Sequence, residues 1–319
     1  MKKELELWNF VLAKLRQSKQ AALLVVAESS GSSPGRKGFK MAVADVEMCG
    51  SIGGGVMEIN LVKSVQGKGN SAESKSKIVE QVHRKSSPAS SGMICSGKQT
   101  VIFFELNYSD LKTIEKIIYA LKNNLSKTIS ISNIKLQVLN SKRDEPDFTL
   151  ERSGENGFLY KEKLGCKNKL FIIGGGHCAL ALSELMSKMD FHISLFDDRA
   201  DLNTIAKNKF VDEKKIIESY EKIGDYIESG QNIYVVVMTL GYKFDEIVIR
   251  KLFNKNFRYF GVLGSKSKMK TLLGNLAKEG FDKEKLARIR TPIGLLINSR
   301  TPEEIAVSIA AEIIACKNP

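Results

Sequence analysis

Cysteine and histidine are scarce in this sequence, and long apolar runs are missing from it. The 319 residues include 5 cysteines and 3 histidines. No C-x-x-C pair occurs, so neither a zinc site nor a disulfide framework is indicated, and a histidine-rich metal site is not expected. Scattered cysteines are typical of a reducing cytoplasm. No H-E-x-x-H, Walker or Ser-His-Asp pattern appears. No apolar run reaches the roughly 18 residues that a membrane-spanning helix needs.

The charge balance is basic, with a formal net charge of +13. Such an excess suits nucleic acid, a membrane surface or an anionic small ligand. The lysines are spread over the whole chain, and we recognise no basic patch interleaved with aromatic residues. We therefore expect a lysine-rich solvated surface that favours an anionic ligand, with neither nucleic acid nor membrane as a partner. The first 15 residues predict an amphipathic helix and not a signal peptide, because acids interrupt their basic start.

The length predicts two domains, with a boundary near Gly165. We expect a mixed α+β N-terminal domain over 1–164, ending in antiparallel strands within 127–163. Strand and helix then alternate over 165–319, which predicts a Rossmann-like parallel sheet and an α/β fold class. The expected helices cover 4–18, 57–65, 109–121 and 244–252, and others begin near 177, 269 and 302. The expected strands are 21–27, 40–46, 100–106, 170–173, 192–196, 233–238 and 259–263, with a strand or short helix at 78–84.

The stretch 169–199 organises the second domain. An apolar strand runs into Gly174-x-Gly176-x-x-Ala179, a helix begins near His177, and the next strand ends at Asp197. Glycines allow a pyrophosphate to approach the backbone, a helix N-terminus favours an anion, and an acid some twenty residues on binds ribose hydroxyls. This order predicts a nucleotide-type site, and a purely structural tight turn is the alternative. His177 is a ligand contact or a neutral first residue of the helix.

Two further glycine-rich turns and a cysteine stand in the first domain. Residues 28–38 form a small, polar, basic loop that could coordinate phosphate oxygens or simply be a surface loop. Residues 50–58 place three glycines before a helix, which is again an anion-site pattern. Cys95 lies between glycines, where amide donors would favour a thiolate; a small buried apolar residue is the alternative.

The second domain offers two weaker signals. Ser265 and Lys266 follow a strand and either contact phosphate or cap a helix. Thr301-Pro302-Glu303-Glu304 predicts a capping box, so Glu304 is read as a cap. The helix that follows is expected to direct its isoleucines inward, and these are Ile305, Ile309, Ile313 and Ile314.

Taken in order, these motifs resemble the XdhC/CoxI family, which comprises accessory proteins for the maturation of xanthine dehydrogenase, carbon monoxide dehydrogenase and related molybdenum hydroxylases. In the N-terminal half the resemblance rests on 31–36, 38–41, 50–55 with Glu58, and 91–97. In the C-terminal half it rests on 174–177, 197–199, 235–239, 264–266, 292–294 and 300–306.

The resemblance implies a mixed N-terminal domain joined to a Rossmann-type domain that together bind molybdenum cofactor (molybdopterin), support its sulfuration and deliver it to the apo-enzyme. It implies an apo molybdenum hydroxylase of the xanthine dehydrogenase type as partner, leaves a cysteine desulfurase open as a second one, and suggests a homodimer. Cys95 is then the residue expected to contact the metal or its sulfur. The other implied cofactor contacts are Ser32, Ser33, Arg36, Lys40, Gly53, Gly54 and Gly55 in one cleft with Cys95, and Gly174, Gly176, His177, Asp197, Ser265 and Lys266 for a phosphate or nucleotide portion.

The sequence also departs from the family pattern. Val56 stands where many members carry a second cysteine, and Leu240 and Tyr242 stand where many carry histidines. Three functions remain open: a non-catalytic cofactor chaperone, an oxidoreductase that binds NAD(P) through Asp197, and a scaffold that bridges a sulfur donor and the target enzyme.

Overall fold

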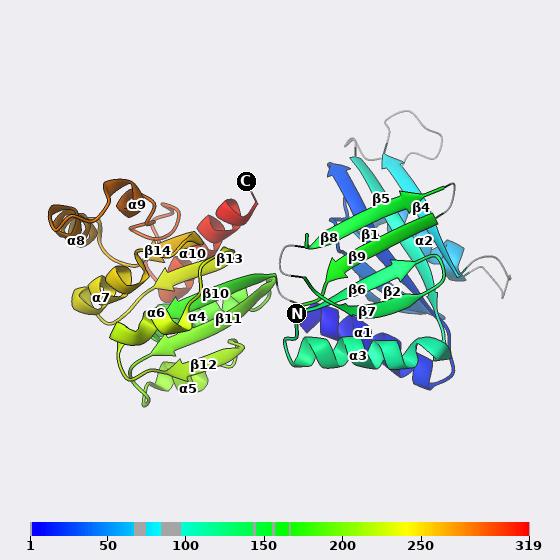
Figure 1. Cartoon of the computed structure of the whole chain (residues 1–319), viewed down its shortest axis with the longest axis horizontal. Coiled ribbons are helices and arrows are strands. Elements are labelled where there is room, and N and C mark those ends of the chain that lie inside the picture. The colour runs from blue at the N-terminus through cyan, green and yellow to red at the C-terminus, as the bar shows by residue number, and fades with distance from the viewer. Residues whose placement is uncertain are drawn as a thin grey trace. The chain divides into compact units, whose positions relative to one another are not determined.

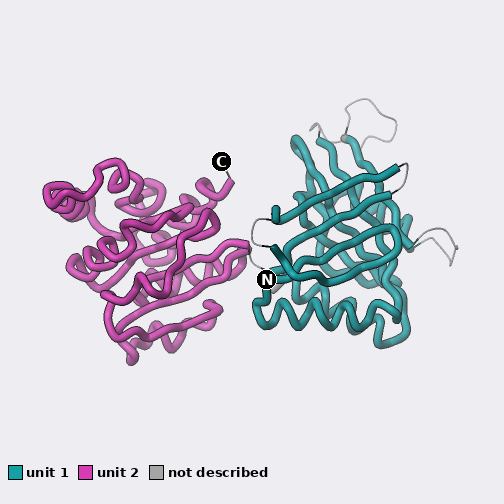
Figure 2. The backbone as a smooth tube through the Cα atoms, viewed as in Figure 1, with its two compact units in different colours: residues 1–165 teal, residues 166–319 magenta. Residues whose placement is uncertain are grey.

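The chain forms two compact units, residues 1–165 and residues 166–319 (Figure 2). They are seen in a computed structural model that describes residues 2–66, 75–83, 97–142, 145–154, 157–165 and 167–318. Among these residues, no helix is both long and apolar enough to cross a membrane.

The described residues of unit 1 form two antiparallel sheets with three helices around them (Figure 1). The first sheet has the order β3-β2-β1-β5-β4 and consists of β1 (Ala21–Gly31), β2 (Lys40–Ala44), β3 (Glu47–Gly50), β4 (Ser76–His83) and β5 (Gly97–Leu106). The second has the order β7-β6-β9-β8 and consists of β6 (Lys127–Ser132), β7 (Leu136–Asn140), β8 (Phe148–Ser153) and β9 (Gly157–Lys163). The helices are α1 (Lys2–Arg16), α2 (Gly55–Gln66) and α3 (Leu111–Lys122), the last preceded by a 3-10 turn at Tyr108–Asp110.

The first sheet is buried on both faces, which explains the continuous apolar run of β1. Alternate side chains of a strand point to opposite faces. Leu23 and Val25 therefore pack with α1, α3 and the second sheet, whereas Leu24 and Val26 pack under α2. The buried strand predicted at 21–27 and the antiparallel strands predicted within 127–163 are confirmed.

Unit 2 is a five-stranded parallel sheet of order β12-β11-β10-β13-β14. Its strands are β10 (Asn168–Ile173), β11 (Phe191–Asp197), β12 (Glu213–Ile216), β13 (Gly230–Val237) and β14 (Phe257–Val262). Its helices are α4 (His177–Met186), α5 (Asn203–Lys207), α6 (Ile223–Tyr226), α7 (Tyr242–Leu252), α8 (Lys266–Lys278), α9 (Lys283–Ala287) and α10 (Pro302–Lys317), with a 3-10 turn at Tyr220–Lys222. The chain starts at the centre with β10 and builds outward in both directions, so the strand order reverses between β10 and β13. Ligands of such folds bind at this switch point.

Helices cover both faces of the parallel sheet. Phe171 and Ile173 of β10 pack in one apolar core with α7 and α8, and Leu170 and Ile172 pack in the other with α4 and α10. A short apolar run is therefore sufficient for a central strand, because each side chain finds a core. The predicted Rossmann-like fold is confirmed.

Two local expectations are corrected, and one strand was missed. The helix expected over 109–121 is divided: a 3-10 turn at Tyr108–Asp110, which Asn107 caps in a capping box with Asp110, precedes α3, and Asp110 is the N-cap residue of α3 without a side-chain capping bond to it. Ile314 is 37% exposed, so it belongs to the outer stripe of α10. The edge strand β12 was missed because all four of its residues are exposed and no apolar alternation marks it. The ambiguous segment at 78–84 lies in a strand, β4, that ends at His83.

Candidate functional site

The glycine turn after β10 is held against the end of β13. Gly174 has φ +105°, and a Cβ there would lie 2.2 Å from the Met238 carbonyl oxygen. Only glycine fits such a backbone conformation and such a contact. The turn predicted from the sequence therefore lies at the switch point of the sheet.

Gly176 and His177 form an open helix N-terminus. Gly176 is the N-cap of α4 and has no side chain to accept a hydrogen bond from the first turn. No atom lies within 4 Å of the place where its Cβ would be, and His177 is exposed. The first N–H groups of a helix need acceptors and carry the positive end of its dipole. This end of α4 is therefore suited to an anionic group.

Asp197 does not present its carboxylate to a ligand as expected. Its Oδ2 accepts a hydrogen bond from the Gly175 N–H at 2.6 Å, and the Arg199 guanidinium donates to both oxygens at 2.9 and 2.8 Å. The carboxylate side chain is fully buried. Burial by itself raises the pKa of Asp197, but the hydrogen bonds from Arg199 and from the Gly175 amide outweigh it and lower the pKa. Asp197 therefore braces the glycine turn from inside.

Asp245 is a further candidate for the site, and the sequence motifs did not single it out. It is 5% exposed and accepts a hydrogen bond from the Thr239 hydroxyl at 2.6 Å. Burial raises its pKa against the effect of that bond, and buried acids with raised pKa are candidates for functional roles. Its signal in the sequence was its position, since it lies on the same helical stripe as the buried residues Val248 and Leu252.

The turn after β14 lies beside the same strand end. The Leu263 N–H donates to the Val237 carbonyl, so Ser265 and Lys266 follow at the same edge of the sheet. Both are exposed, and the Ser265 side chain does not cap α8. We call the group of Gly174–His177, Thr239, Asp245, Ser265 and Lys266 the carboxyl-edge site.

Three glycine-rich segments meet in unit 1. A Cβ at Gly53 would lie 2.4 Å from the Gly35 nitrogen, and a Cβ at Gly97 would lie 2.5 Å from the Ser33 nitrogen. Such distances mean that the backbones touch, which only glycine permits. We call residues 31–38, 50–55 and Gly97 the three-loop site. Cys95, the expected metal contact, lies outside the described residues.

The serines and the arginine of the first loop differ in their roles. Ser33 is buried, and both its hydroxyl and the Gly35 N–H donate to the Gln99 side-chain oxygen at 2.9 and 3.1 Å. Ser33 therefore holds the loop in place. Ser32 and Arg36 are exposed, and within the described part of the chain Arg36 has only a long bond to the Gly31 carbonyl. Of the contacts predicted in this loop, Ser32 and Arg36 are therefore the ones that remain available to a ligand.

Glu58 occupies the amide groups of the second glycine turn. Its Oε2 accepts hydrogen bonds from the Ser51 hydroxyl at 2.7 Å and from the amides of Ile52 and Gly54 at 2.8 and 3.1 Å. Burial raises the pKa of Glu58, but these hydrogen bonds outweigh it and lower the pKa. Space remains at Gly54, where no atom of the described residues other than its chain neighbours lies within 4 Å of a Cβ position. A ligand here would use that space and not the amides.

Lys40 lies in an internal ion-pair cluster, where its amine also donates to the Gly38 carbonyl at 3.2 Å. Its Nζ is 2.7 Å from the Glu162 carboxylate and 3.3 Å from that of Glu4, and its side chain is 7% exposed. Burial by itself lowers the pKa of Lys40, but the charges of the two carboxylates outweigh it, so the pKa is raised and the amine stays charged. Lys40 thus links α1, β2 and β9. In the described ranges, no group of three His, Cys, Asp or Glu side chains is arranged to hold a metal ion.

Comparison with known proteins identifies two matching regions. The XdhC Rossmann domain matches residues 170–313, and the XdhC and CoxI family matches residues 14–79. Over 157 residues the chain is 29% identical to the uncharacterized protein YqeB of Escherichia coli K12, covering 48% of this chain and 28% of that protein. It is also 29% identical over 157 residues to a probable xanthine dehydrogenase subunit of Bacillus subtilis 168, covering 49% of this chain and 45% of that protein. Both matches span less than half of the relative's length.

The fold has a counterpart among solved structures. A Bacillus halodurans protein described as a xanthine dehydrogenase superposes with a TM-score of 0.71 at 21% identity, over 98% of this chain and 95% of that chain. At this identity the likeness concerns the fold. The relationship rests on the two family regions, residues 14–79 in unit 1 and residues 170–313 in unit 2, and it agrees with the resemblance of the motifs. The chain belongs to the XdhC/CoxI family.

Proposed function

We propose that this protein is an accessory factor that binds molybdenum cofactor and supports its sulfuration and its insertion into a molybdenum hydroxylase of the xanthine dehydrogenase type. The observation that carries the proposal is the meeting of the loops at Gly35, Gly53 and Gly97, because these segments hold the family motifs of unit 1. Cys95 stands two residues before Gly97 in the sequence. The name of the Bacillus subtilis relative supports the class of client enzyme.

The residues of the three-loop site fit an anionic pterin in part. Arg36 supplies a cation, Ser32 a hydroxyl, and the space over Gly54 allows close approach to the backbone. Glu58 already satisfies two amides of the turn, so the cofactor would be held by Arg36 and Cys95 and not by an amide nest. Molybdenum cofactor supplies redox chemistry to the client; this chain would bind the cofactor, orient it and shield it.

The carboxyl-edge site would hold a phosphate or nucleotide portion. The N-terminus of α4 at Gly176 and His177 is open to an anion, and Ser265 and Lys266 are exposed at the same edge. The strand order is also compatible with a dinucleotide, which favours an NAD(P)-dependent oxidoreductase as the second candidate. That candidate is weaker because Asp197 is committed to Gly175 and Arg199 and has no exposed oxygen for a ribose.

The proposal extends to partners and setting. It requires an apo molybdenum hydroxylase as client, includes a cysteine desulfurase as sulfur donor, and favours a homodimer. A cytoplasmic setting keeps thiols reduced, as the sulfur step would need. The protein would act without catalytic turnover of its own.

Replacement of Cys95 by alanine is expected to weaken cofactor retention at least about tenfold, which corresponds to the loss of one strong contact. The measurement is a titration of the purified protein with molybdenum cofactor. Cys49→Ala is the matched control, because the Cys49 thiol lies on β3 and its pKa is raised by burial and by the nearby Glu6. Equal retention in Cys95→Ala and in the control would make Cys95 structural and remove the metal contact from the proposal.

Replacement of Gly176 by valine is expected to block ligands at the carboxyl-edge site. The backbone at Gly176, with φ −71° and ψ −169°, is open to any residue, and the added side chain would enter the empty space above the turn. Unit 2 should stay folded, while affinity for a phosphorylated ligand should fall, and less so in Gly176→Ala. Separate titrations with molybdenum cofactor, NAD and NADP identify the ligand. Tight nicotinamide binding with turnover, and no pterin binding, would overturn the chaperone in favour of the oxidoreductase.

A further inference from the structure

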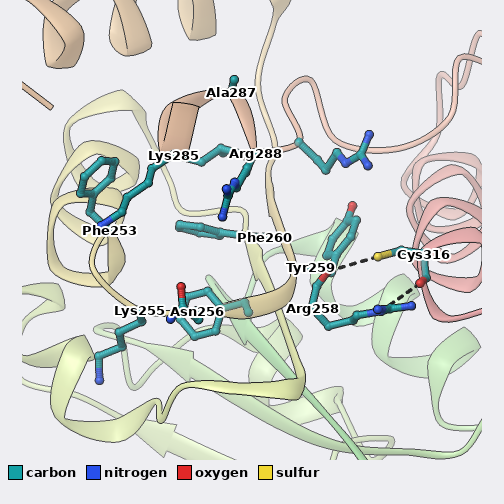
Figure 3. A pocket seen from close by; sticks show the side chains of 13 residues that line it. Phe253, Lys255, Asn256, Arg258, Tyr259, Phe260, Lys285, Ala287, Arg288 and Cys316 are labelled. Carbon is teal, nitrogen blue, oxygen red and sulfur yellow. Dashed lines mark hydrogen bonds between the residues drawn. The ribbon is translucent and has the colours of Figure 1, made fainter. Parts of the chain in front are cut away.

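A pocket of unit 2 lies beside β14 and has no part in the sites above. Its volume is about 430 Å³. It lies between the end of α7, the segment 285–290 and the last turn of α10 (Figure 3). It shares no lining residue with the carboxyl-edge site.

The chain closes the pocket by covering the edge of β14 from two sides. Arg290 extends the sheet, since its N–H donates to the Phe260 carbonyl at 2.8 Å and its carbonyl accepts from the Val262 N–H at 2.9 Å. Toward the other end of β14, the Cys316 thiol donates to the Arg258 carbonyl at 3.1 Å, and Arg258 Nε donates back to the Cys316 carbonyl. The pocket is therefore a built feature of the unit.

The charges of the pocket wall are all positive. Among the residues that the structure describes, the lining includes five cationic side chains and no acidic one. The Lys255 and Arg258 side chains already donate hydrogen bonds to backbone carbonyls. The other three, Lys285, Arg288 and Arg290, are exposed, and within the described ranges no carboxylate pairs with them.

A carboxylate does stand near two of these cations. Asp282 caps α9 by accepting a hydrogen bond from the Lys285 N–H at 3.0 Å. That bond lowers its pKa, with smaller contributions from Lys285 and Arg288. Because Asp282 is held as a cap and does not line the pocket, the wall keeps a net positive charge.

Aromatic rings form a second part of the wall. Phe257 and Phe260 are packed edge to face, 5.6 Å between centroids, and the Lys285 amine lies 5.6 Å from the centre of the Phe253 ring. The Arg288 side chain points toward Phe260 (Figure 3). Rings bind flat aromatic groups, and arginines bind phosphate with paired donors. The same wall thus offers both.

We infer that this pocket binds a mononucleotide, with the base against Phe253 or Phe260 and the phosphate held by the exposed cations of the wall, among them Arg288 and Arg290. The volume is in the range of small-molecule sites. Three exposed cations suit the charge of a single phosphate group better than the many charges of a nucleic-acid chain. The inference does not depend on the proposed function, because it uses none of the residues of either site above.

The test is calorimetric titration of the full chain with AMP, GMP, adenosine and inorganic phosphate. We expect AMP or GMP to bind one per chain, and adenosine and phosphate to bind at least about tenfold more weakly, because each lacks one half of the contacts. Phosphate binding as tightly as AMP would overturn the role of the rings. Adenosine binding as tightly as AMP would overturn the role of the arginines, and absence of binding by either nucleotide would overturn the site.

Variants of the pocket test whether AMP binds here. The double change R288Q and R290Q should lower affinity for AMP about tenfold or more, and Lys283→Gln, an exposed lysine of the same helix α9 that does not line the pocket, should leave it unchanged. Arg288→Gln alone serves if the double variant does not fold by circular dichroism. Unchanged affinity in these arginine variants, or loss of AMP binding in Gly176→Val instead, would assign the nucleotide to the carboxyl-edge site and overturn the inference.

Discussion

Replacement of Lys40 by methionine is expected to destabilise unit 1 by about 3–5 kcal/mol, the typical cost of breaking a buried ion pair by removing one partner. Lys40 bonds to the carboxylates of Glu162 and Glu4 inside the protein. Glu162 is 4% exposed and also accepts the Tyr160 hydroxyl at 2.9 Å. Methionine fills most of the space but removes the positive charge that Lys40 supplies to these two carboxylates.

The change can be followed in unit 1 alone. Trp8 is the single tryptophan of the chain and is fully buried on α1, so the urea dependence of its fluorescence reports this unit. Lys37→Met is the matched control; Lys37 is exposed and lies over the Phe148 ring, and its loss should cost within about 0.5 kcal/mol. An equally small cost for Lys40→Met would contradict the internal role. A stable Lys40→Met protein that no longer binds cofactor would instead restore Lys40 as a ligand contact.

The elements were predictable where a local pattern carried the information. The apolar runs at 21–27 and 170–173 predicted central strands, because each of their side chains is buried in one of two cores. The glycine turn at 174–176 and the helix beginning at His177 followed from chemistry within a few residues. The strand Glu213–Ile216 had no such signal, since an exposed edge strand needs no apolar side chain.

Side-chain partners were not predictable in the same way. Lys40 and Glu162 are 122 residues apart in the sequence. The residues that neighbour Lys40 in the sequence gave no indication that a buried carboxylate would pair with it. The pocket beside β14 was not predictable for the same reason. Its rings and cations come from 253–260, 285–290 and Cys316, so a search for a local basic and aromatic pattern could not detect it.

The glycine turns at 50–55 and 174–176 share a feature that limits how they can bind a ligand. In each, an acid of the chain accepts hydrogen bonds from the amides of the turn: Glu58 from Ile52 and Gly54, and Asp197 from Gly175. Glycine turns that face an anion need donors, and these donors are already partly satisfied. Ligands at either turn must therefore rely on the remaining groups, which are the open helix end at Gly176 and the cation Arg36.

Replacement of Asp197 by asparagine is expected to destabilise unit 2 by about 3 kcal/mol at neutral pH. Asparagine keeps one oxygen acceptor, but its NH₂ group would face the N–H donors of Gly175 or Arg199. The substitution also removes the negative charge closest to the Arg199 guanidinium. Asp198, 3.7 Å from Arg199 Nε, compensates in part. Hydrogen exchange of β10 and β11 amides measures the loss, and the exchange of β1 amides in unit 1 provides the control.

The pH dependence of this loss tests its cause. The pKa of Asp197 is lower in the folded protein than its ordinary value of about 3.9. The carboxylate therefore contributes stability that is fully present above the unfolded pKa and is lost as the pH falls through the folded one. Asparagine does not titrate, so the difference between the wild type and Asp197→Asn should be constant from about pH 7 to 5 and should shrink below about pH 4. A difference that stays constant in acid would show that packing, and not the charge on Asp197, braces the turn.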